Sequence, residues 1–152
     1  MRVAGPADVA ALVETRVALF DEIGQGSPAG AERDAFRVAC REILGELLLD
    51  GRGTAWVAVD AGSGVQGAAI LLEFPRLPSP LRLRALEGYV LNVWVAPQAR
   101  RRGIATALVA AAVAEARRRG HARIRLHSTE EGRRVYERLG FSGRTNEMEL
   151  VL

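Results

Sequence analysis

The sequence predicts a single α/β domain in which helices flank a central mixed β-sheet. Three observations lead to this prediction: two amphipathic helical segments open the chain, three strand-like segments follow, and helix then alternates with strand to the end. The 152 residues are enough for one hydrophobic core, and no repeat or linker divides them. We therefore expect one domain over residues 1–152.

Two helices are predicted in the first third of the chain. Asp8 is a candidate N-cap of the first, because its side chain can accept a hydrogen bond from the first helical turn. The apolar stripe of this helix consists of Val9, Leu12, Val13, Val17, Phe20 and Ile23. A glycine-containing segment, residues 24–30, ends it. The second helix is predicted over residues 31–49, with an inner side of Phe36, Cys40, Ile43, Leu44, Leu47 and Leu48.

Three strands are predicted next. Residues 54–59 and 67–74 flank a short turn, which indicates an antiparallel hairpin. The turn spells G-x-G-x-x-G over residues 62–67, but a dinucleotide site requires a helix after this motif, and a strand follows here. Residues 87–95 are almost continuously apolar, which is typical of a strand buried on both faces.

The last third alternates helix and strand. Helices are predicted over residues 103–119 and 130–139, and strands over 124–127 and 148–152. Residues 128–131 fit a capping box at the start of the second of these helices, and Gly140 with Phe141 fits a left-handed cap at its end. The strand–helix–strand unit that begins at residue 87 is expected to be parallel and right-handed.

Composition excludes several classes of protein. The net charge is +3 and the pI is about 9.9, yet 18 acidic residues are spread along the same segments and aromatics make up only 5%. Because a nucleic-acid surface would need stacking aromatics among its basic clusters, we expect no nucleic-acid partner. The longest apolar run is shorter than the roughly 20 residues of a membrane span. We therefore expect no membrane association, no signal peptide and a cytoplasmic location.

Cysteine and lysine usage narrows the chemistry further. Cys40 is the only cysteine, so neither an internal disulfide nor a cysteine-based zinc site can form, and we expect no metal. All 21 basic side chains are arginines. The absence of lysine removes Schiff-base chemistry and the phosphate-loop lysine of nucleotide hydrolases.

An anion site is predicted where the apolar strand meets the following helix. The strand ends at Val95, Pro97 stops it, a basic turn follows, and a helix opens at Gly103. The first N–H groups of a helix have no intrahelical partner and lie at the positive end of the helix dipole. Gly103 lacks a Cβ, which allows close approach of a phosphate oxygen, and neighbouring arginines add charge-assisted hydrogen bonds.

This turn resembles a known family motif. Arg100–Ala105 matches the acyl-CoA pyrophosphate motif of the GNAT (Gcn5-related N-acetyltransferase) superfamily, in which Arg or Gln is followed by x-x-Gly-x-Gly or Ala. Val135–Phe141, Val-Tyr-Glu-Arg-Leu-Gly-Phe, is similar to the last-helix signature of the same family. The order of predicted elements also fits, so the resemblance covers essentially the whole chain.

The resemblance implies a GNAT-like fold and an acyl-CoA-dependent N-acetyltransferase, an enzyme that moves the acetyl group of acetyl-CoA to an amine. It implies that Tyr136 is the general acid that protonates the leaving thiolate. Thr129, seven residues earlier, stands where many relatives carry a coenzyme-binding Asn, so its hydroxyl is a further candidate contact. The coenzyme contacts it implies are Val93, Trp94 and Val95 for the pantetheine arm, and Arg100, Arg101, Arg102, Gly103, Ile104, Ala105 and Thr106 for the pyrophosphate.

The acceptor side is less defined by the sequence. Glu87 and Glu73 are candidates for the general base, and Glu73 and Asn92 for contacts to the acceptor, although each also fits a solvated strand end or a satisfied core amide. His127 is expected to be structural and His121 exposed. The expected partner is a small-molecule, amino-acid or peptide amine, and a homodimer is among the expected states because pairing is common in the family. The alternative function is a GNAT-like domain that senses acyl-CoA without turnover.

Overall fold

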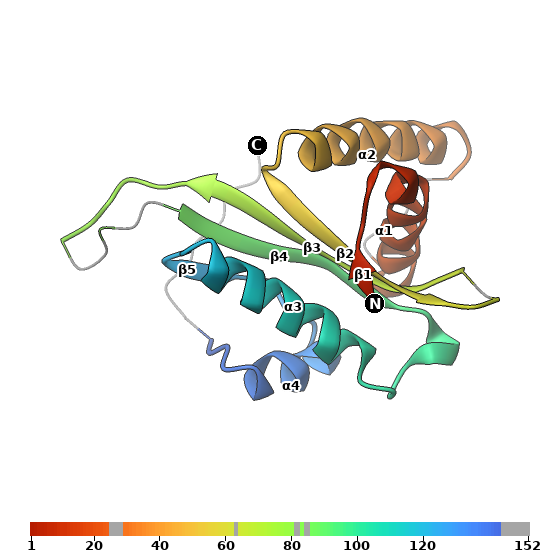
Figure 1. Ribbon diagram of the computed structural model, residues 1–152. Coiled ribbons are helices and arrows are strands. Elements are labelled where there is room, and N and C mark those ends of the chain that lie inside the picture. The colour runs from red at the N-terminus through yellow and green to blue at the C-terminus, as the bar shows by residue number, and fades with distance from the viewer. Residues whose placement is uncertain (25–28, 63, 81–82, 84–85, 144–152) are drawn as a thin grey trace.

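The computed structural model describes residues 1–24, 29–62, 64–80, 83 and 86–143. Within these residues, five strands form one sheet in the order β1-β2-β3-β4-β5 (Figure 1). The strands are β1 (Arg2–Val3), β2 (Gly53–Asp60), β3 (Gly64–Pro75), β4 (Leu86–Val95) and β5 (Arg123–Arg125). The α-helices are α1 (Val9–Ile23), α2 (Ala31–Leu49), α3 (Ile104–Arg118) and α4 (Glu130–Arg138), and short 3₁₀ turns cover Pro6–Asp8 and Pro97–Ala99.

The sheet is mixed, as predicted. Strands β1 to β4 pair antiparallel, whereas β4 and β5 pair parallel across the α3 connection. The β2–β3 pairing runs from Gly53 opposite Leu72 to Asp60 opposite Gly64, which confirms the hairpin. Gly64 has φ of +72°, a left-handed conformation that glycine adopts without strain. The G-x-G-x-x-G spelling is therefore a hairpin turn that continues into β3.

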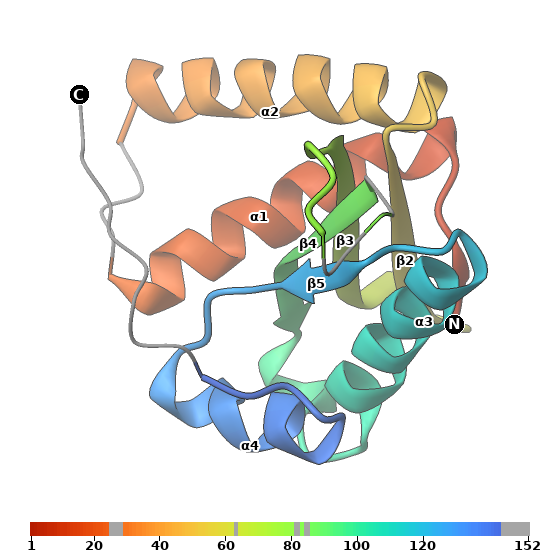
Figure 2. The same cartoon turned by 90° about the vertical axis from the view of Figure 1, so that its left-hand side faces the viewer.

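Helices α1 and α2 cover one face of the sheet, and α3 covers the other (Figure 2). The α1–α2 side is filled by Leu12 and Val13 of α1, Leu44 and Leu47 of α2, and alternate residues of the sheet such as Val57. Ile43 was predicted on the inner side of α2, but 62% of its surface is exposed. The buried stripe of α2 runs through residues 40, 44, 47 and 48, and Ile43 lies on its flank.

The opposite core lies under α3. Trp56 and Leu71 of the sheet pack against Leu108, Ala112 and Ala116 of this helix. The small alanine side chains of α3 allow this helix to pack directly against the strands. Helix α4 contacts α3 and lies on the same side of the molecule (Figure 2).

Two N-terminal features differ from the sequence prediction. Strand β1 was not predicted, because two residues are too short to produce an alternating pattern. Asp8 does stand at the N-cap of α1, but its carboxylate makes no capping hydrogen bond to the helix. Instead it accepts hydrogen bonds from the Arg2 guanidinium at 2.6 and 2.7 Å and from the Gly5 N–H at 2.9 Å. The carboxylate thus holds β1 against the start of α1.

Helix α4 begins at the predicted residue, Glu130, and ends one residue earlier than predicted, at Arg138. Its N-cap is Thr129, one residue after the predicted Ser128, and the Thr129 Oγ1 accepts the Gly132 N–H at 3.2 Å. At the other end Gly140 has φ of +89°, and the N–H groups of Gly140 and Phe141 bond the carbonyls of Glu137 and Tyr136. This double hydrogen bond is the predicted left-handed cap. The predicted strand over residues 148–152 lies outside the described residues.

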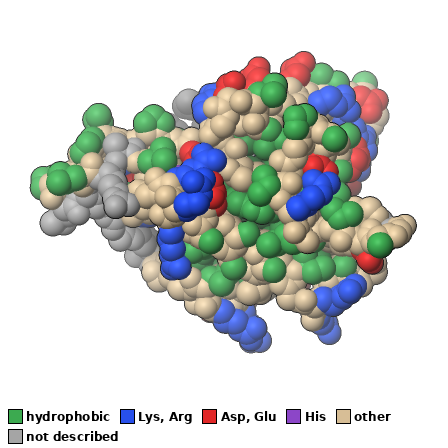
Figure 3. All heavy atoms as spheres, viewed as in Figure 1, with side chains coloured by type: hydrophobic (Ala, Val, Ile, Leu, Met, Phe, Trp, Pro, Cys, Tyr) green, Lys and Arg blue, Asp and Glu red, His purple; other side chains and the backbone are tan. Residues whose placement is uncertain are grey.

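The charged surface is divided into small groups. On the face in view, arginine side chains stand apart from one another, several with carboxylates beside them (Figure 3). Arg118 and Arg119, for example, both bond Glu115 at 2.6 Å. None of the described helices combines the length and apolar character that crossing a membrane requires.

Candidate functional site

The parallel pair β4–β5 separates along its length. The two strands pair at Glu87–Arg123, Gly88–Ile124 and Tyr89–Arg125, after which β5 ends while β4 continues to Val95. The predicted strand over residues 124–127 is thus shorter and earlier than expected. In the described part of the chain, residues 90–95 have no strand partner on this side. Their backbone is positioned to bind an extended ligand by β-type hydrogen bonds.

A β-bulge at Asn92 accompanies this separation. The pairing with β3 shifts between Ala68 and Ile70, and Asn92 has φ of +53°. Its side chain is buried, and Nδ2 donates to Thr15 Oγ1 of α1 at 3.0 Å. Oδ1 has no hydrogen-bond partner among the described residues. The Asn92 side chain, which the sequence suggested as a contact to the acceptor, therefore ties the bulge to α1. Its nitrogen behaves as the satisfied core amide that was the alternative.

The turn after β4 is braced by the end of α1. Glu22 accepts a hydrogen bond from the indole N–H of Trp94 at 3.1 Å and one from the guanidinium of Arg100. The Nε of Arg100 also donates to the carbonyl of Val95 at 3.0 Å. Trp94 and Arg100 are thus held by the protein itself, and sequence reasoning missed Glu22 because it lies in a different helix.

The start of α3 presents backbone donors and arginine charge together. Arg101 and Gly103 have φ of +59° and +77°, and the first helical hydrogen bond runs from the Ala107 N–H to the Gly103 carbonyl at 2.9 Å. The N–H groups of residues 104–106 therefore lack an intrahelical partner. The side chains of Arg101 and Arg102 are exposed beside them. This arrangement can bind a diphosphate through its backbone and two guanidinium groups.

Gly103 has a second role that the sequence did not reveal. Its positive φ favours glycine regardless of space, and a Cβ added there would meet nothing within 4 Å. The protein therefore leaves open space in front of this residue. The backbone therefore favours glycine at this position, and the open space leaves room for a ligand.

Tyr136 lies against the first turn of its own helix. Its ring meets Phe141 edge-on with centroids 6.1 Å apart. A Cβ on Gly132 would come 3.2 Å from Cε2 and 3.7 Å from the hydroxyl of this tyrosine, and 3.3 Å from Thr129 Oγ1. Burial raises the pKa of the Tyr136 phenol, which keeps it protonated at neutral pH. The phenol is therefore a proton donor held close to Thr129.

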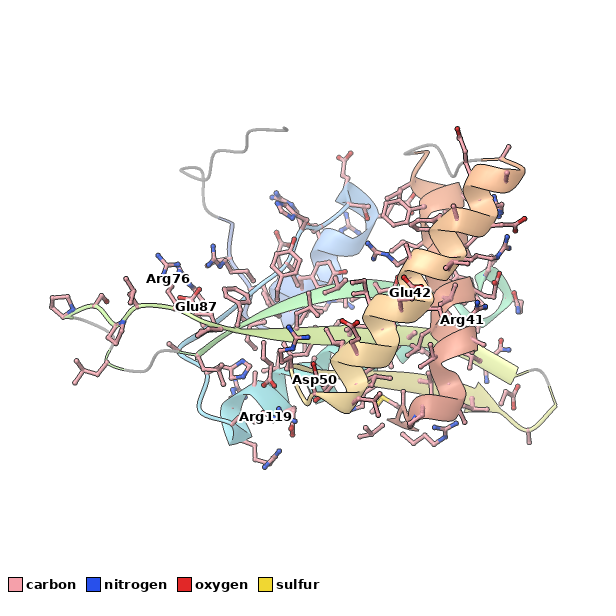
Figure 4. All side chains as sticks on the ribbon, turned by 90° about the horizontal axis from the view of Figure 1, so that it is seen from above. Arg41, Glu42, Asp50, Arg76, Glu87 and Arg119 are labelled. Carbon is pink, nitrogen blue, oxygen red and sulfur yellow. The ribbon has the colours of Figure 1, made fainter. Side chains whose placement is uncertain are left out.

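The two carboxylates proposed from sequence are both engaged. Glu87 is buried and accepts hydrogen bonds from Arg125 at 2.7 Å, Arg123 at 2.9 Å and Arg76 at 3.4 Å (Figure 4). Burial raises the pKa of Glu87, but the hydrogen bonds from Arg125 and Arg123 outweigh it, and the net pKa is lowered. A carboxylate stabilised in its charged form is a poor general base. We therefore do not assign the base to Glu87.

Glu73 bonds groups at the end of α3. Its carboxylate pairs with Arg119 and accepts from, or donates to, His121 Nε2 at 2.6 Å, according to the protonation of the two groups. The expectation that His121 is exposed is wrong, because 1% of its side chain is accessible. Glu73 thus joins β3 to the segment after α3, and neither it nor His121 is available to an acceptor.

A pair of titratable side chains lies where β4 and β5 separate. The phenol of Tyr89 and Nδ1 of His127 share a hydrogen bond, and their ring centroids are 5.8 Å apart. Sequence reasoning treated His127 as structural and passed over Tyr89. Only the parallel pairing of the strands brings these two residues together.

The structure thus combines a parallel strand pair that opens beside a bulge with a helix start that presents unpaired backbone donors and arginines. The sequence profile described as the acetyltransferase (GNAT) family matches residues 17–141. The chain belongs to this family.

Solved structures agree with this assignment. A GCN5-related N-acetyltransferase from Ralstonia eutropha is 32% identical, with a TM-score of 0.84 over 99% of this chain and 96% of that one. A predicted acetyltransferase from Clostridium acetobutylicum, solved with acetyl-CoA, is 24% identical with a TM-score of 0.87 over 99% and 94%. A Trypanosoma brucei acetyltransferase is 23% identical with a TM-score of 0.71 over 99% and 97%. The last two show the fold alone. No functionally curated protein matches the chain.

Proposed function

We propose that this protein transfers the acetyl group of acetyl-CoA to an amine of a small molecule, an amino acid or a peptide. The observation that carries the proposal is the opening between β4 and β5 beside the donors at the start of α3. The membership of the family supports acetyl transfer in general. The particular reaction and its residues are our inference from the arrangement of side chains.

The coenzyme contacts divide into two groups. In the proposal, the N–H groups of Ile104, Ala105 and Thr106 and the side chains of Arg101 and Arg102 hold the pyrophosphate. Val93 and Val95 offer backbone groups to the pantetheine arm, and Trp94 and Arg100 act by bracing the turn through Glu22. Thr129 Oγ1 already accepts the Gly132 N–H, which leaves its O–H and one lone pair for the coenzyme.

The proposed reaction is a direct attack. The uncharged amine nitrogen forms a bond to the thioester carbonyl carbon, and a backbone N–H near Val93 stabilises the oxyanion. The carbon–sulfur bond then breaks while the Tyr136 phenol donates a hydrogen bond to the sulfur, and the sulfur takes this proton as the phenol recovers one from the amine nitrogen. A thiol, with an ordinary pKa of about 8.5, is the stronger acid of the two, so Tyr136 assists chiefly by donating a hydrogen bond as charge develops on sulfur.

The proposed partner is the amine acceptor, and we infer no role for nucleic acid or a membrane. We infer that the protein acts in the cytoplasm. A homodimer is compatible with the proposed site.

Calorimetry and thiol release test the proposal. The protein should bind acetyl-CoA, and a panel of amino acids, peptides, polyamines and small amines should contain at least one that releases coenzyme A. Binding without release for any amine would favour the sensing alternative. Absence of binding would overturn the coenzyme site.

A Gly103→Asn variant separates the two roles of this glycine. Asparagine tolerates positive φ better than other residues, so the variant should fold with nearly unchanged stability. Its side chain would occupy the open space in front of residue 103, and acetyl-CoA affinity should fall by at least about tenfold, roughly the contribution of one charge-assisted hydrogen bond. Unchanged affinity in a folded variant would argue against pyrophosphate at this position.

A further inference from the structure

We propose that His127 takes the proton of the acceptor ammonium group and that Tyr89 positions it; this inference rests on the proposed acetyl transfer. An alkylamine is mostly protonated at neutral pH and cannot attack a thioester until it loses a proton. The reaction therefore needs an acceptor for that proton near the thioester.

The pair lies at the place where the two strands part. Tyr89 is opposite Arg125 in the last β4–β5 pair, and His127 follows two residues later. Tyr89 also precedes the Asn92 bulge by three residues. In the proposed complex, the thioester lies beside this bulge. The imidazole is thus at the mouth of the opening that the acetyl group would occupy.

Tyr89 lies on the face of the sheet opposite the proposed coenzyme turn, where an acceptor could approach. Val90 packs into the core under α3, and Leu91 packs against the core under α1 and α2. Because side chains alternate along a strand, Tyr89 lies on the α1–α2 face with Leu91. The coenzyme donors lie on the other side, at the start of α3. An amine held near Tyr89 therefore approaches from the face opposite the coenzyme turn.

The imidazole is free to act at its second nitrogen. His127 is exposed, its Nδ1 is bonded to Tyr89, and no described residue bonds its Nε2. When Nδ1 carries the hydrogen and donates it to the phenol oxygen, Nε2 keeps a lone pair that faces solvent. The other groups proposed as bases are engaged: Glu87 by three arginines, and Glu73 by Arg119 and His121.

The protons balance over the full reaction. Nε2 of His127 takes one proton from the ammonium group, directly or through one water, and the neutral amine adds to the thioester carbonyl. The nitrogen loses a second proton as the amide forms, and this proton replaces the one that the departing sulfur takes from Tyr136, so that the phenol is regenerated. The products are an acetylated amine and coenzyme A, and His127 returns its proton to solvent.

Charged groups on the elements that carry the pair contribute to its pH dependence. They are Arg125, opposite Tyr89 on β5, and Glu87 on the Tyr89 strand with its partners Arg123 and Arg76. Glu130 and Glu131 in the first turn of α4 follow His127 in the sequence, and Tyr136 is the proposed acid. Because these groups are the same in wild type and variant, the comparison of the two pH profiles isolates the imidazole.

The experiment compares two amines in the thiol-release assay. One is an alkylamine found by the panel, and the other is hydroxylamine, which is largely unprotonated at neutral pH. His127→Ala should lower kcat/KM for the alkylamine by about 100-fold, and for hydroxylamine by only about threefold, as expected for loss of a general base. Added imidazole should restore part of the alkylamine activity, and the pH profiles of wild type and variant should differ.

Two further variants serve as controls. Tyr89→Phe should produce a smaller loss for the alkylamine, because the ring stays and the hydrogen bond to Nδ1 is removed. Ser128→Ala, next to His127 and also exposed, should behave as wild type. Acetyl-CoA affinity should be unchanged in all three, which shows that the coenzyme site is intact.

The outcomes distinguish this inference from the proposed function. Equal losses with both amines, or no response to imidazole, would overturn the role of His127 while acetyl transfer stands. A wild-type protein that binds no acetyl-CoA and releases no thiol with any amine would overturn the proposed function and this inference with it.

Discussion

The guanidinium of Arg100 bonds the carboxylate of Glu22, a residue 78 positions earlier at the end of α1. Arg100 is the first residue of the motif that suggested a pyrophosphate site, yet its side chain is directed to this carboxylate and to the Val95 carbonyl. In the proposed site its contribution is therefore indirect, because it holds the turn whose next residues would face the coenzyme.

Loss of the Arg102 side chain is predicted to affect acetyl-CoA affinity, and loss of the Arg100 side chain the free energy of unfolding. Arg102→Ala should weaken acetyl-CoA binding about tenfold with unchanged stability, because it removes a charge-assisted contact. Arg100→Ala should lower the free energy of unfolding by about 0.5–1 kcal/mol, the usual range for an exposed ion pair. Calorimetry and urea unfolding measure the two effects. Glu22→Gln should reproduce the stability loss of Arg100→Ala, and additive losses in the double variant would contradict the pairing.

Gly67 is predicted to be intolerant of alanine. A Cβ there would lie 3.0 Å from Ile104 Cγ2 and 3.0 Å from the Trp94 carbonyl, so the Ile104 side chain and the β4 backbone would have to shift. Gly67→Ala should lower the free energy of unfolding by roughly 1–3 kcal/mol and weaken acetyl-CoA binding, because residue 104 starts the coenzyme turn.

Gly45→Ala is the matched control for Gly67→Ala. It lies inside α2, and a Cβ there would meet nothing within 4 Å. Alanine should raise the free energy of unfolding by up to about 1 kcal/mol through its higher helix propensity. If both alanine variants changed stability in the same direction, the packing argument for Gly67 would fail.

Gly132 is predicted to set the position of the Tyr136 ring. An alanine Cβ would approach the ring to 3.2 Å and Thr129 Oγ1 to 3.3 Å, so the phenol must shift. Gly132→Ala should lower kcat between about 10-fold and 100-fold while acetyl-CoA affinity stays within a small factor, because misplacement of a reacting group lowers the rate. Steady-state thiol release measures the change. Wild-type kcat in a folded Gly132→Ala protein would show that the position of Tyr136 is not limiting.

Stability is predicted to fall in acid partly through Glu115. Hydrogen bonds from Arg118 and Arg119 lower the pKa of Glu115 to about 2 from the ordinary carboxyl value. A lowered pKa stabilises the folded state above the unfolded value, near 4.3, and this stabilisation is lost as the pH falls toward 2. Glu115→Gln should therefore lower the free energy of unfolding at pH 7, on the order of 1 kcal/mol after solvent screening.

Urea unfolding between pH 7 and pH 2.5 measures this effect. The difference between wild type and Glu115→Gln should shrink as the pH falls. Glu46→Gln, an exposed glutamate of α2, is the control and should change stability little at any pH. A constant difference across the range would contradict the role of the Glu115 carboxylate.

The sequence by itself determined most of the elements and the motif of the proposed coenzyme turn. Periodicity, caps and turn residues are local, so the bounds of α2, the hairpin and the cap at Gly140 could all be predicted. The motif at residues 100–105 is also local, and it lies within residues 17–141, which match the family profile.

Only the tertiary structure decided which side chains are free to act. The three arginines around Glu87 come from β5 and from the segment after β3, and Glu22 reaches Arg100 from another helix. Tyr89 meets His127 because β4 and β5 pair in parallel register. The chemistry of an ionisable group depends on its partners and burial, and these are set by contacts between distant residues that no local pattern records.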